Sequence, residues 1–587
     1  MRPAISIRNL MLAGLCSLGS GGEFSVDLRH TFFSRRESWI ALHPTDRPAT
    51  LRYVFSRMLE EKGPWLDLGF LVEGSLRPAA ITATASHVQV SAGGSAAPRA
   101  QVYLVGRFDA VIEAWGMDLS LTGVKTGLDL GKAAEGPASR LALSAEGWTL
   151  DVQVLQGRAE REGQAWRLRA EKGRLRVVFR MHQGAAATAA AAGLAPDPEA
   201  DMAAIARDWE GFRAKMPAVP AERTAMAEAA WWNLWSLYAP PDTNFPTPAV
   251  LVAKADMNAV WPWDHCFPAL ALGRTDLDAG LEQFLLPFLN ADEHGQLPDE
   301  TAPDFMYRGV TKPPIHGWAL MKLMDWHPFS QAQLERVYPK LAKWTEFWFR
   351  RRDSNHNGIP EYAGEHSGWE SGWDNASGLG DKKAAYESPD LQAYLVLQMK
   401  ALARVARELG RPAEAADWDR RAEGHLKLLM ARFWNGRHFV VRKAGQEAAD
   451  PEPTSLLNLM PLVLGEHLDK AVFNTLAKEL EARFLTPYGP ATEDPQSPHY
   501  RSDGYWRGPI WAPTTYLLAD GLRRGGRPDL SRLIAKRFCD MVARAGGHYE
   551  NYDSLSGQGL RCRGFAWTSA VDLLLMHEYL QGPLPPK

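Results

Sequence analysis

The stretch at residues 183–198, QGAAATAAAAGLAPDP, separates two halves of the chain that differ in hydrophobic periodicity. It is low in complexity and contains two prolines near its end, which is typical of a linker or a wrapped connection. We therefore expect one domain at residues 1–182, a linker at 183–198 and a second domain at 199–587. The chain length of 587 residues allows about two to four domains at roughly 100–200 residues each.

Before this stretch, apolar and polar residues alternate. The alternation runs through residues 101–108, 111–121, 140–144, 148–155 and 166–179, separated by Gly, Pro and Asn or Asp breaks. A period of two is that of strands with one buried face, so this half is predicted to be an antiparallel β-sandwich. Residues 30–42 are aromatic and basic enough to reach a neighbouring active-site rim, but packing between domains explains them more simply.

After the stretch the period becomes 3.6, and strand candidates are nearly absent. About a dozen helices are expected, among them residues 199–215, 222–238, 274–289, 330–351, 383–409, 412–433, 467–484, 528–545 and 565–580. The pattern allows an irregular bundle, a solenoid or a closed double ring of helices. Alternate connections are long and rich in Trp, Gly, Pro, Asp and Glu. A barrel of six helix pairs would gather those loops at one rim, and long loops in a compact domain are usually functional.

The composition excludes some classes of protein. Lys plus Arg number 66 and Asp plus Glu number 69, so the net charge of −3 makes no electrostatic case for nucleic acid binding. The four cysteines are widely separated, which indicates neither a zinc site nor a disulfide framework. Tryptophan is unusually frequent, with 22 residues against 15 Tyr, and its broad apolar face with one N–H donor suits stacking on sugar rings or filling a large core.

The N-terminus superficially resembles a secretion signal, because Arg2 and Arg8 flank a short apolar stretch at residues 10–15. That stretch is short for a signal and lacks an A-x-A-like cleavage site, so we expect a cytoplasmic protein. No apolar run approaches the roughly 18 residues that a membrane-spanning helix needs, so we expect no membrane partner.

Five segments place a carboxylate or an arginine beside Trp or Tyr. They are WPWDHCF at 261–267, YRGVTKPPIHGWAL at 307–320, GWESGWDN at 368–375, YWRGPIW at 505–511 and HYENYDSLSGQG at 548–559. Aromatic platforms beside carboxylates are what hydrolysis of a glycosidic bond needs, because one acid protonates the leaving oxygen and one carboxylate activates water or attacks.

Each segment also has a simpler interpretation. A WD or WxW in a helical protein is more often core packing than a substrate contact. Asp374 could be a helix N-cap, YENYD a turn with a surface Glu550, and Arg507 a partner in a buried salt bridge. Spacing and composition alone leave these alternatives open for every residue.

The segments GWESGWDN, YWRGPIW and HYENYDSLSGQG, in that order, resemble glycoside hydrolase family 63, with kinship to the family 37 trehalases through ESGWD. The resemblance covers residues 199–587. The Thr-Lys-Pro-Pro segment and the chain length are most similar to the bacterial branch with mannosylglycerate and glucosylglycerate hydrolases. The resemblance implies an (α/α)6 barrel behind an N-terminal β-domain, a mainly α protein, and an inverting mechanism.

The resemblance also implies roles for single residues. The Asp of ESGWD is the family's general acid and corresponds to Asp374, and the Glu of YENY is its general base and corresponds to Glu550. Pocket residues implied by the same motifs are Trp263, Asp264, Trp506 and Arg507, and further candidates for the wall are Trp373, Asn375, Trp511, Tyr549 and Trp567.

These roles make chemical demands. Asp374 must hold a proton, which desolvation by Trp369 and Trp373 would favour. Glu550 must be ionised, which a wetter setting would permit. Inversion needs room for a water, so the two carboxyls should lie about 6.5–9.5 Å apart, against about 5.5 Å for retention. Glu370 is the rival acid.

Lys312 departs from the related bacterial hydrolases, which commonly carry Gln before the double proline. A cation there could meet a carboxylate on the aglycone, such as glycerate. It could equally be a surface lysine paired with a nearby acid, which we favour.

The segment RRDSNHNGIPEY at 351–362 spaces Asp353, Asn355, Asn357 and Glu361 like the first half of a calcium loop. Position twelve of that loop would be Gly364, which has no ligating side chain. A structural calcium is allowed, but an Asx-turn explains the residues as well and is favoured. No cofactor is expected to be required.

The predicted function is therefore an inverting glycoside hydrolase that acts on a small α-glucoside or α-mannoside, with a small carbohydrate as its partner. The alternative within the same class is a trehalase-like or oligosaccharide α-glucosidase. A polysaccharide lyase, which would use Tyr or His, and a carbohydrate-binding protein without turnover are the remaining rivals.

Overall fold

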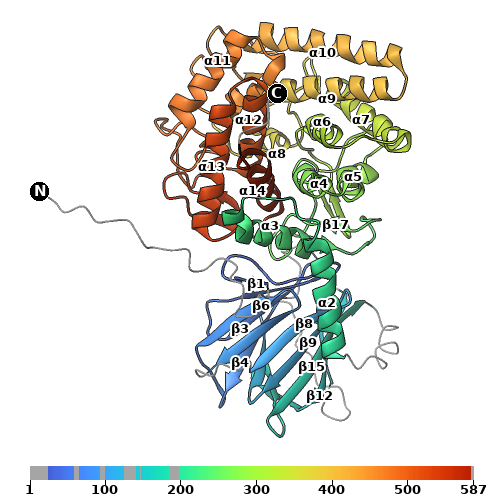
Figure 1. Ribbon diagram of the computed structural model, residues 1–587, viewed down its shortest axis with the longest axis vertical. Coiled ribbons are helices and arrows are strands. Elements are labelled where there is room, and N and C mark those ends of the chain that lie inside the picture. The colour runs from blue at the N-terminus through green and yellow to red at the C-terminus, as the bar shows by residue number, and fades with distance from the viewer. Residues whose placement is uncertain are drawn as a thin grey trace, which may run out of the picture.

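The computed structural model describes residues 24–58, 65–92, 99–124, 140–145, 147–183 and 197–582. A sheet-rich region comes first along the chain and a helical region follows, and the two lie at opposite ends of the molecule in Figure 1. The linker prediction falls mostly on residues 184–196 and the prediction about a signal on residues 1–23, and both segments lie outside the described residues.

The sheet-rich region contains two antiparallel sheets. In spatial order, the first sheet contains β1 Ser25–Val26, β6 Ala79–Thr84, β7 His87–Ala92, β8 Ala100–Val105, β9 Asp109–Trp115, β15 Arg174–Gln183, β12 Trp148–Gln156 and β11 Arg140–Ala145. The second contains β13 Arg158–Glu162, β14 Ala165–Arg169, β10 Asp118–Gly123, β4 Trp65–Val72, β3 Thr50–Phe55 and β2 Ile40–Pro44, with β5 Ser75–Leu76 beside β4.

The two sheets pack against each other through aromatic side chains. Tyr53 of the second sheet lies 5.9 Å from Phe179 of the first, ring centre to ring centre, and Phe55 lies 4.9 Å from Trp148. The stretches 111–121 and 166–179 were each expected to be one strand, and that is wrong. Each is broken by a reversal at a left-handed glycine, Gly116 (φ 66°) and Gly173 (φ 72°), so that its two halves join different sheets.

The helical region begins with α2 Pro198–Arg213, whose N-cap is Asp197 in the quoted linker stretch. The other helical segments are η2 Ala221–Arg223, α3 Thr224–Leu237, α4 Cys266–Gly273, α5 Leu277–Leu285, η3 Leu286–Asn290, α6 His316–Trp326, α7 Gln331–Arg351, α8 Ser367–Ser371, α9 Pro389–Glu408, α10 Pro412–Phe433, η4 Leu456–His467, α11 Lys470–Glu479, η5 Leu480–Phe484, α12 Ala512–Arg524, α13 Pro528–Ala545 and α14 Ala566–Tyr579.

Short strand pairs lie in the connections between these helices. They are β16 Tyr238–Ala239 with β17 Ala249–Val250, β18 Glu300–Ala302 with β19 Phe305–Tyr307, β20 Tyr386–Glu387 with β21 Arg442–Lys443, and β22 Tyr549–Tyr552 with β23 Gly559–Arg563. The expected helices at 412–433 and 528–545 are confirmed, whereas the one expected from 383 starts at Pro389. Proline at the first helical position explains the later start, because the residues before it prefer extended backbone.

Helices of the described chain contact one another in a closed cycle. In this cycle α14 contacts α4, α4 contacts α6, α6 contacts α9 and α9 contacts η4. The cycle closes because η4 contacts α12 and α12 contacts α14. A second set packs outside this cycle, with α3 on α14, α5 on α4, α7 and α10 on α9, α11 on η4, and α13 on α12. Among the described residues, none of these helices has the length and apolar character needed to cross a membrane.

Candidate active site

One pocket collects residues from all five of the segments that combine aromatic and charged residues. Its predicted members are Trp263, Asp264, Lys312, Asp374, Trp506, Trp511, Glu550 and Trp567. Its other lining residues are Met257, Trp261, Gly372, Tyr505 and Phe565. The fold therefore brings together both predicted catalytic carboxyls and six of the predicted pocket residues.

The pocket lies where helices of the closed cycle begin. Asp264 comes two residues before α4, Lys312 four residues before α6, and Trp511 and Phe565 are the N-caps of α12 and α14. Helix N-termini carry a partial positive charge, which favours anionic groups nearby. A cluster of carboxyls at this end of the helices is therefore electrostatically reasonable.

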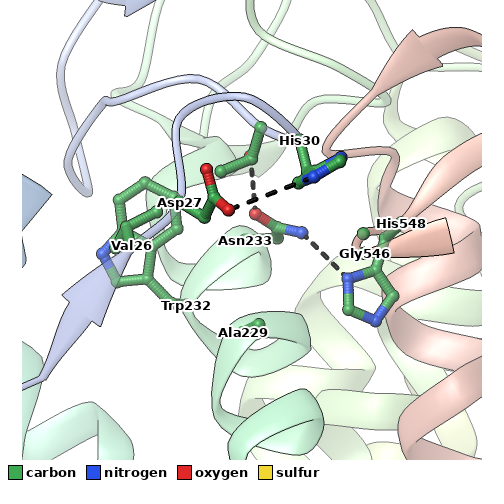
Figure 2. Close-up of a pocket in the computed structure, with 10 residues that line it drawn as sticks. Val26, Asp27, His30, Ala229, Trp232, Asn233, Gly546 and His548 are labelled. Atoms are coloured by element: carbon green, nitrogen blue, oxygen red, sulfur yellow. Dashed lines mark hydrogen bonds and ion pairs between the residues drawn. The ribbon is translucent and has the colours of Figure 1, made fainter. Parts of the chain in front are cut away.

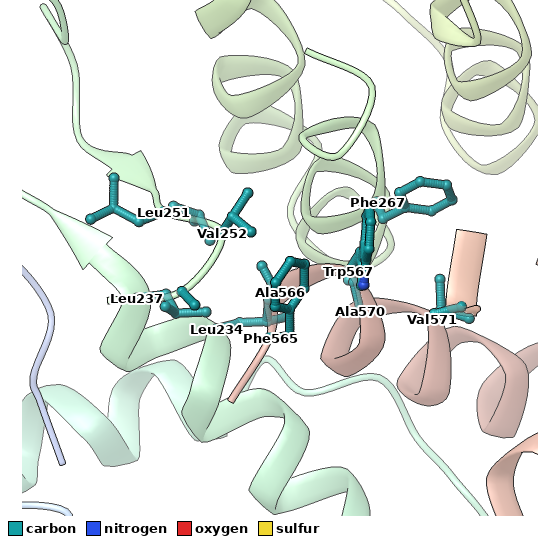
Figure 3. Close-up of a cluster of buried hydrophobic side chains, with 14 of the residues drawn as sticks. Leu234, Leu237, Leu251, Val252, Phe267, Phe565, Ala566, Trp567, Ala570 and Val571 are labelled. Carbon is teal, nitrogen blue, oxygen red and sulfur yellow. The ribbon is translucent and has the colours of Figure 1, made fainter. Parts of the chain in front are cut away.

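Tryptophan side chains form much of the wall. Trp506 and Trp511 stack with ring centres 4.0 Å apart and planes at 7°, and Trp263 meets Trp567 edge to face at 6.1 Å. Figure 3 shows Trp567 within a buried apolar cluster that joins α3, α4 and α14. This close packing holds the four rings against one another.

Four predicted pocket residues are not among the side chains that line this pocket, and their role in its wall stays a prediction. Trp373 is fully buried against Trp506, with ring centres 4.8 Å apart. Asn375 Oδ1 accepts a hydrogen bond from Trp506 N at 2.9 Å, and Arg507 Nε donates to Asn375 O at 2.6 Å. Tyr549 turns its hydroxyl to His30 at 2.7 Å. Their neighbours in sequence take the inward positions instead.

Asp374 is placed by the end of the short helix α8. Gly372 ends that helix in left-handed backbone (φ 71°), and a Cβ on it would lie 2.7 Å from the Trp263 ring, so glycine is needed for both conformation and space. Burial raises the pKa of Asp374, although Lys312 and a hydrogen bond from Tyr505 oppose the shift. The expected direction of the pKa shift is confirmed. Trp369, expected to help bury this carboxyl, is 44% exposed and stacks on His366 instead.

Glu550 lies in β22 opposite an irregularity in β23. The register of the pair shifts between Tyr549 and Asn551, and Arg561 on the facing strand has left-handed backbone (φ 64°). Bulges of this kind re-aim side chains at active sites. The expected wetter setting is wrong: Glu550 is only 5% exposed, and burial raises its pKa to about 7 against the opposing charge of Arg561.

Lys312 is buried rather than on the surface, but it is paired with an acid as expected. Its Nζ lies 3.0 Å from Asp299 Oδ1 and donates to Trp369 O at 2.7 Å. Burial raises the pKa of the neighbouring Asp264 well above its usual value, with Lys312 opposing the shift. Asp299 was not predicted, because nothing aromatic or repeated in its segment distinguishes it.

Glu370, the rival acid, is engaged away from the pocket. Its Oε1 accepts hydrogen bonds from Nε and Nη2 of Arg352 at 2.9 and 2.7 Å, and its Oε2 accepts from the amides of Ala363 and Gly364 at 2.6 and 2.8 Å. The side chain is fully buried. This carboxylate braces the loop that carries Asp374.

The loop at residues 353–361 makes Asx-turn hydrogen bonds. Asn355 Oδ1 accepts from the amide of Asn357 at 3.1 Å, and Asn357 Oδ1 accepts from the amide of Ile359 at 2.8 Å, each two residues further on. The Asp353 carboxylate also accepts from the amide of Asn357 at 3.0 Å. Among the described residues Glu361 Oε2 has no hydrogen-bond partner, so an oxygen-seeking cation would fit there. A group of three or more His, Cys, Asp or Glu side chains arranged for a metal is not found in the described part of the chain. The calcium site stays a prediction.

Known proteins resemble this chain in sequence. A family model, the mannosylglycerate hydrolase MGH1-like glycoside hydrolase domain, matches residues 257–568. A mannosylglycerate hydrolase from Thermus thermophilus is 25% identical over 406 residues, which are 53% of this chain and 93% of the relative. A periplasmic trehalase from Xanthomonas campestris is 29% identical over 236 residues, which are 37% of this chain and 40% of the relative.

Solved structures resemble it in fold. The Thermus thermophilus family 63 mannosylglycerate hydrolase in complex with glucose matches with a TM-score of 0.52 and 20% identity, over 59% of this chain and 99% of that one. A bacterial glucoamylase complexed with acarbose matches with a TM-score of 0.62 and 11% identity, over 97% of this chain and 96% of that one. The second likeness extends over the sheet-rich region as well as the helices.

Proposed function

Because this chain belongs to the mannosylglycerate hydrolase MGH1-like glycoside hydrolase family, we propose that it is an inverting hydrolase of a small α-glucoside or α-mannoside. The observation that carries this proposal is the pair of carboxyls, Asp374 and Glu550, on one pocket walled by tryptophan. Raised carboxyl pKa values in a concave site are a common mark of acid–base chemistry. Glucosylglycerate and mannosylglycerate are the first substrates to test.

In the proposed mechanism Asp374 donates its proton to the glycosidic oxygen as the bond from that oxygen to the anomeric carbon breaks. Glu550, in its ionised form, takes a proton from a water that attacks the anomeric carbon from the opposite face. The oxygen of the new anomeric hydroxyl comes from that water, so an α-glycoside yields a β-sugar and a free aglycone alcohol. Trp263, Trp506 and Trp567 would shield the sugar from bulk water.

We interpret the closed cycle of helices with its outer set as an (α/α)6 barrel, and the two packed sheets as a β-sandwich. The fold-level likeness to the bacterial glucoamylase supports this interpretation. The domain limits that we propose are residues 1–182 and 199–587. In this arrangement the pocket opens at the end of the barrel where the inner helices start.

The second candidate is a trehalase-like or oligosaccharide α-glucosidase, which acts on an uncharged substrate. It is favoured by the ion pair between Lys312 and Asp299, since a lysine already paired offers less to a glycerate carboxylate. The sequence likeness to periplasmic trehalases supports the same alternative.

Proton NMR of the enzyme with glucosylglycerate, mannosylglycerate, trehalose, kojibiose and nigerose tests both candidates. Release of the β-anomer in the first seconds from one of these substrates, lost in Asp374→Asn, is the expected result. Early α-anomer would mean retention and would remove the role of Glu550 as a water-activating base. Binding of a sugar without hydrolysis, unchanged in Asp374→Asn, would favour a carbohydrate-binding protein.

A further inference from the structure

The sheet-rich region has no role in the proposed chemistry so far. The family model begins at residue 257, after both sheets, and the match to the Thermus thermophilus hydrolase covers 93% of that protein but 53% of this chain. The question is whether this region only packs against the helices or also acts on the pocket.

One segment of the sheet-rich region reaches the strand pair that carries Glu550. His30 Nδ1 lies 2.7 Å from the hydroxyl of Tyr549, the residue directly before Glu550. Arg563 Nη1 donates to the carbonyl of Arg29 at 3.1 Å. Tyr549 and Arg563 are register partners in β22 and β23, so residues 29 and 30 hold both strands at the same rung.

The same segment reaches His548 through one intermediate, as Figure 2 shows. Thr31 Oγ1 donates to Asn233 Oδ1 at 2.9 Å, and Asn233 Nδ2 lies 3.4 Å from His548 Nδ1. The other ring nitrogen of His548 is 3.0 Å from Asp572 Oδ2 of α14. Both residues that precede Glu550 therefore have their side chains fixed, one by His30 and the other through Asn233.

Steric fit also fixes His30. A Cβ at Gly546 would lie 2.9 Å from the His30 ring, and one at Gly547 would lie 2.7 Å from His30 Cβ. The two glycines let the imidazole lie directly against the backbone that leads into β22. Gly546 also ends α13 in left-handed backbone (φ 79°), so the turn needs glycine there for two reasons.

We infer that His30 is a positioning residue for Glu550, holding β22 so that the carboxylate points into the pocket. The inference rests on the proposed function, in which Glu550 is the general base. Trp567 Nε1 donates a hydrogen bond to the backbone carbonyl of Glu550 at 3.1 Å. Strand β22 is therefore held by α14 on one side and by the sheet-rich region on the other.

The chemistry of the contact suits a fixed support. Burial lowers the pKa of His30, with Asp27 opposing the shift, which favours the neutral ring. A neutral imidazole has one donor and one acceptor nitrogen. The Asp27 carboxylate, 4.0 Å from Nε2, favours the tautomer with its proton on Nε2, and in that tautomer Nδ1 accepts a hydrogen bond from the Tyr549 hydroxyl.

The test compares four variants of the full chain: His30→Leu, Tyr549→Phe, the double variant and His30→Asn. Losing the hydrogen bond should lower kcat about tenfold with KM changed less than twofold, because displacing a catalytic group by a fraction of an ångström is costly. The double variant should be no slower than the slower single variant. His30→Asn keeps a hydrogen-bonding atom near the position of Nδ1 and should recover most of the rate.

Hydrogen exchange gives a readout that does not depend on activity. In His30→Leu, peptides covering residues 546–553 should exchange faster while those of α6 and α9 stay unchanged. Arg36→Gln is the matched control: it breaks the ion pair of Arg36 with Asp208, another contact between the two regions, and should leave both kcat and this exchange unchanged.

Two results would overturn the inference: unchanged exchange at 546–553 in His30→Leu, or faster exchange spread over the whole helical region, which would mean general loss of stability. A wild-type protein that hydrolyses none of the panel would count against the proposed function. The exchange pattern would then still decide whether His30 orders β22.

Discussion

Carboxyl groups lie at both ends of the inner helices, but their pKa values shift in opposite directions at the two ends. At the starts of α4, α12 and α14, burial raises the pKa of Glu550 to about 7 and also raises that of Asp374. At the far ends of α6, α12 and α14, burial alone would raise the pKa of Asp520, but Lys322, Arg524 and Arg523 lower it below its usual range.

Pairing explains the difference. Lys322 Nζ lies 3.1 Å from both Asp520 and Glu578, and Arg524 Nε donates to Asp520 at 2.9 Å. Asp520 stays ionised, and its ion pairs and those of Glu578 tie three helices together. In the pocket, burial raises the pKa of both Asp374 and Glu550, and the charge of Asp374 adds to the rise that brings the pKa of Glu550 to about 7. Cation pairing thus separates the carboxyls that hold the fold from those suited to chemistry.

The largest expected effect is in the pocket, at Asp374. Asp374→Asn should lower kcat by about 10³-fold, because general acid catalysis is typically worth 10²–10⁴-fold, while the midpoint of thermal unfolding does not fall. Anomer-resolved NMR and thermal denaturation measure the two. A loss of both rate and stability would show that Asp374 is structural, like Asp520.

At Asp520, which is ion-paired, we expect a loss of stability without a loss of rate. Asp520→Asn should lower the free energy of unfolding by about 3 kcal/mol or more, since it leaves buried cations uncompensated, with kcat per folded molecule unchanged. Urea denaturation at pH 7 measures this. The matched control is Glu335→Gln, whose partner Arg411 forms an exposed pair, and it should change stability by less than about 0.5 kcal/mol.

Glu550→Gln should stabilise the fold in a pH-dependent way. The folded-state pKa of Glu550 is raised from 4.5 to about 7, so ionising it costs stability. That cost is absent below pH 4.5, grows up to about pH 7 and is constant above. The variant should therefore gain up to about 3 kcal/mol at pH 8 and nothing at pH 4.

Urea denaturation at the two pH values measures the gain. Glu370→Gln is the control in the same cluster and should lose stability at pH 8, because it breaks the buried pair with Arg352. In wild type, kcat/KM should rise with pH as Glu550 ionises near pH 7. A profile flat from pH 5 to 8 would contradict its role as base.

The smallest expected effect concerns Lys312, a cation that pairs with Asp299 and also opposes the rise in the pKa of Asp374. In Lys312→Gln the pKa of Asp374 should rise, because the charge that lowers it is gone. The alkaline limb of kcat/KM should therefore move to higher pH. An unmoved limb with a higher KM only for substrates that carry a carboxylate would instead make Lys312 a substrate ligand.

The sequence predicted the two regions and the five segments because periodicity and motif are local. The helix at 412–433 has its limits at Pro412 and Phe433, where local signals suffice. The same logic placed Asp374 and Glu550 on one pocket through motif resemblance. It did not separate Trp373, Asn375, Arg507 and Tyr549 from the lining residues beside them, since a motif does not say which of two neighbours in a loop faces the cavity.

By itself, the amino-acid sequence determined the period of each region, the helix starts at Pro412 and Pro528, and which segments combine carboxylates with tryptophan. Only the tertiary structure decided which side chains share the pocket, that Asp299 pairs with Lys312, that Glu550 is buried rather than wet, and that His30 meets Tyr549 across 519 positions of sequence. The physical reason is that pKa and pairing depend on burial and on contacts between distant segments, which no local pattern encodes.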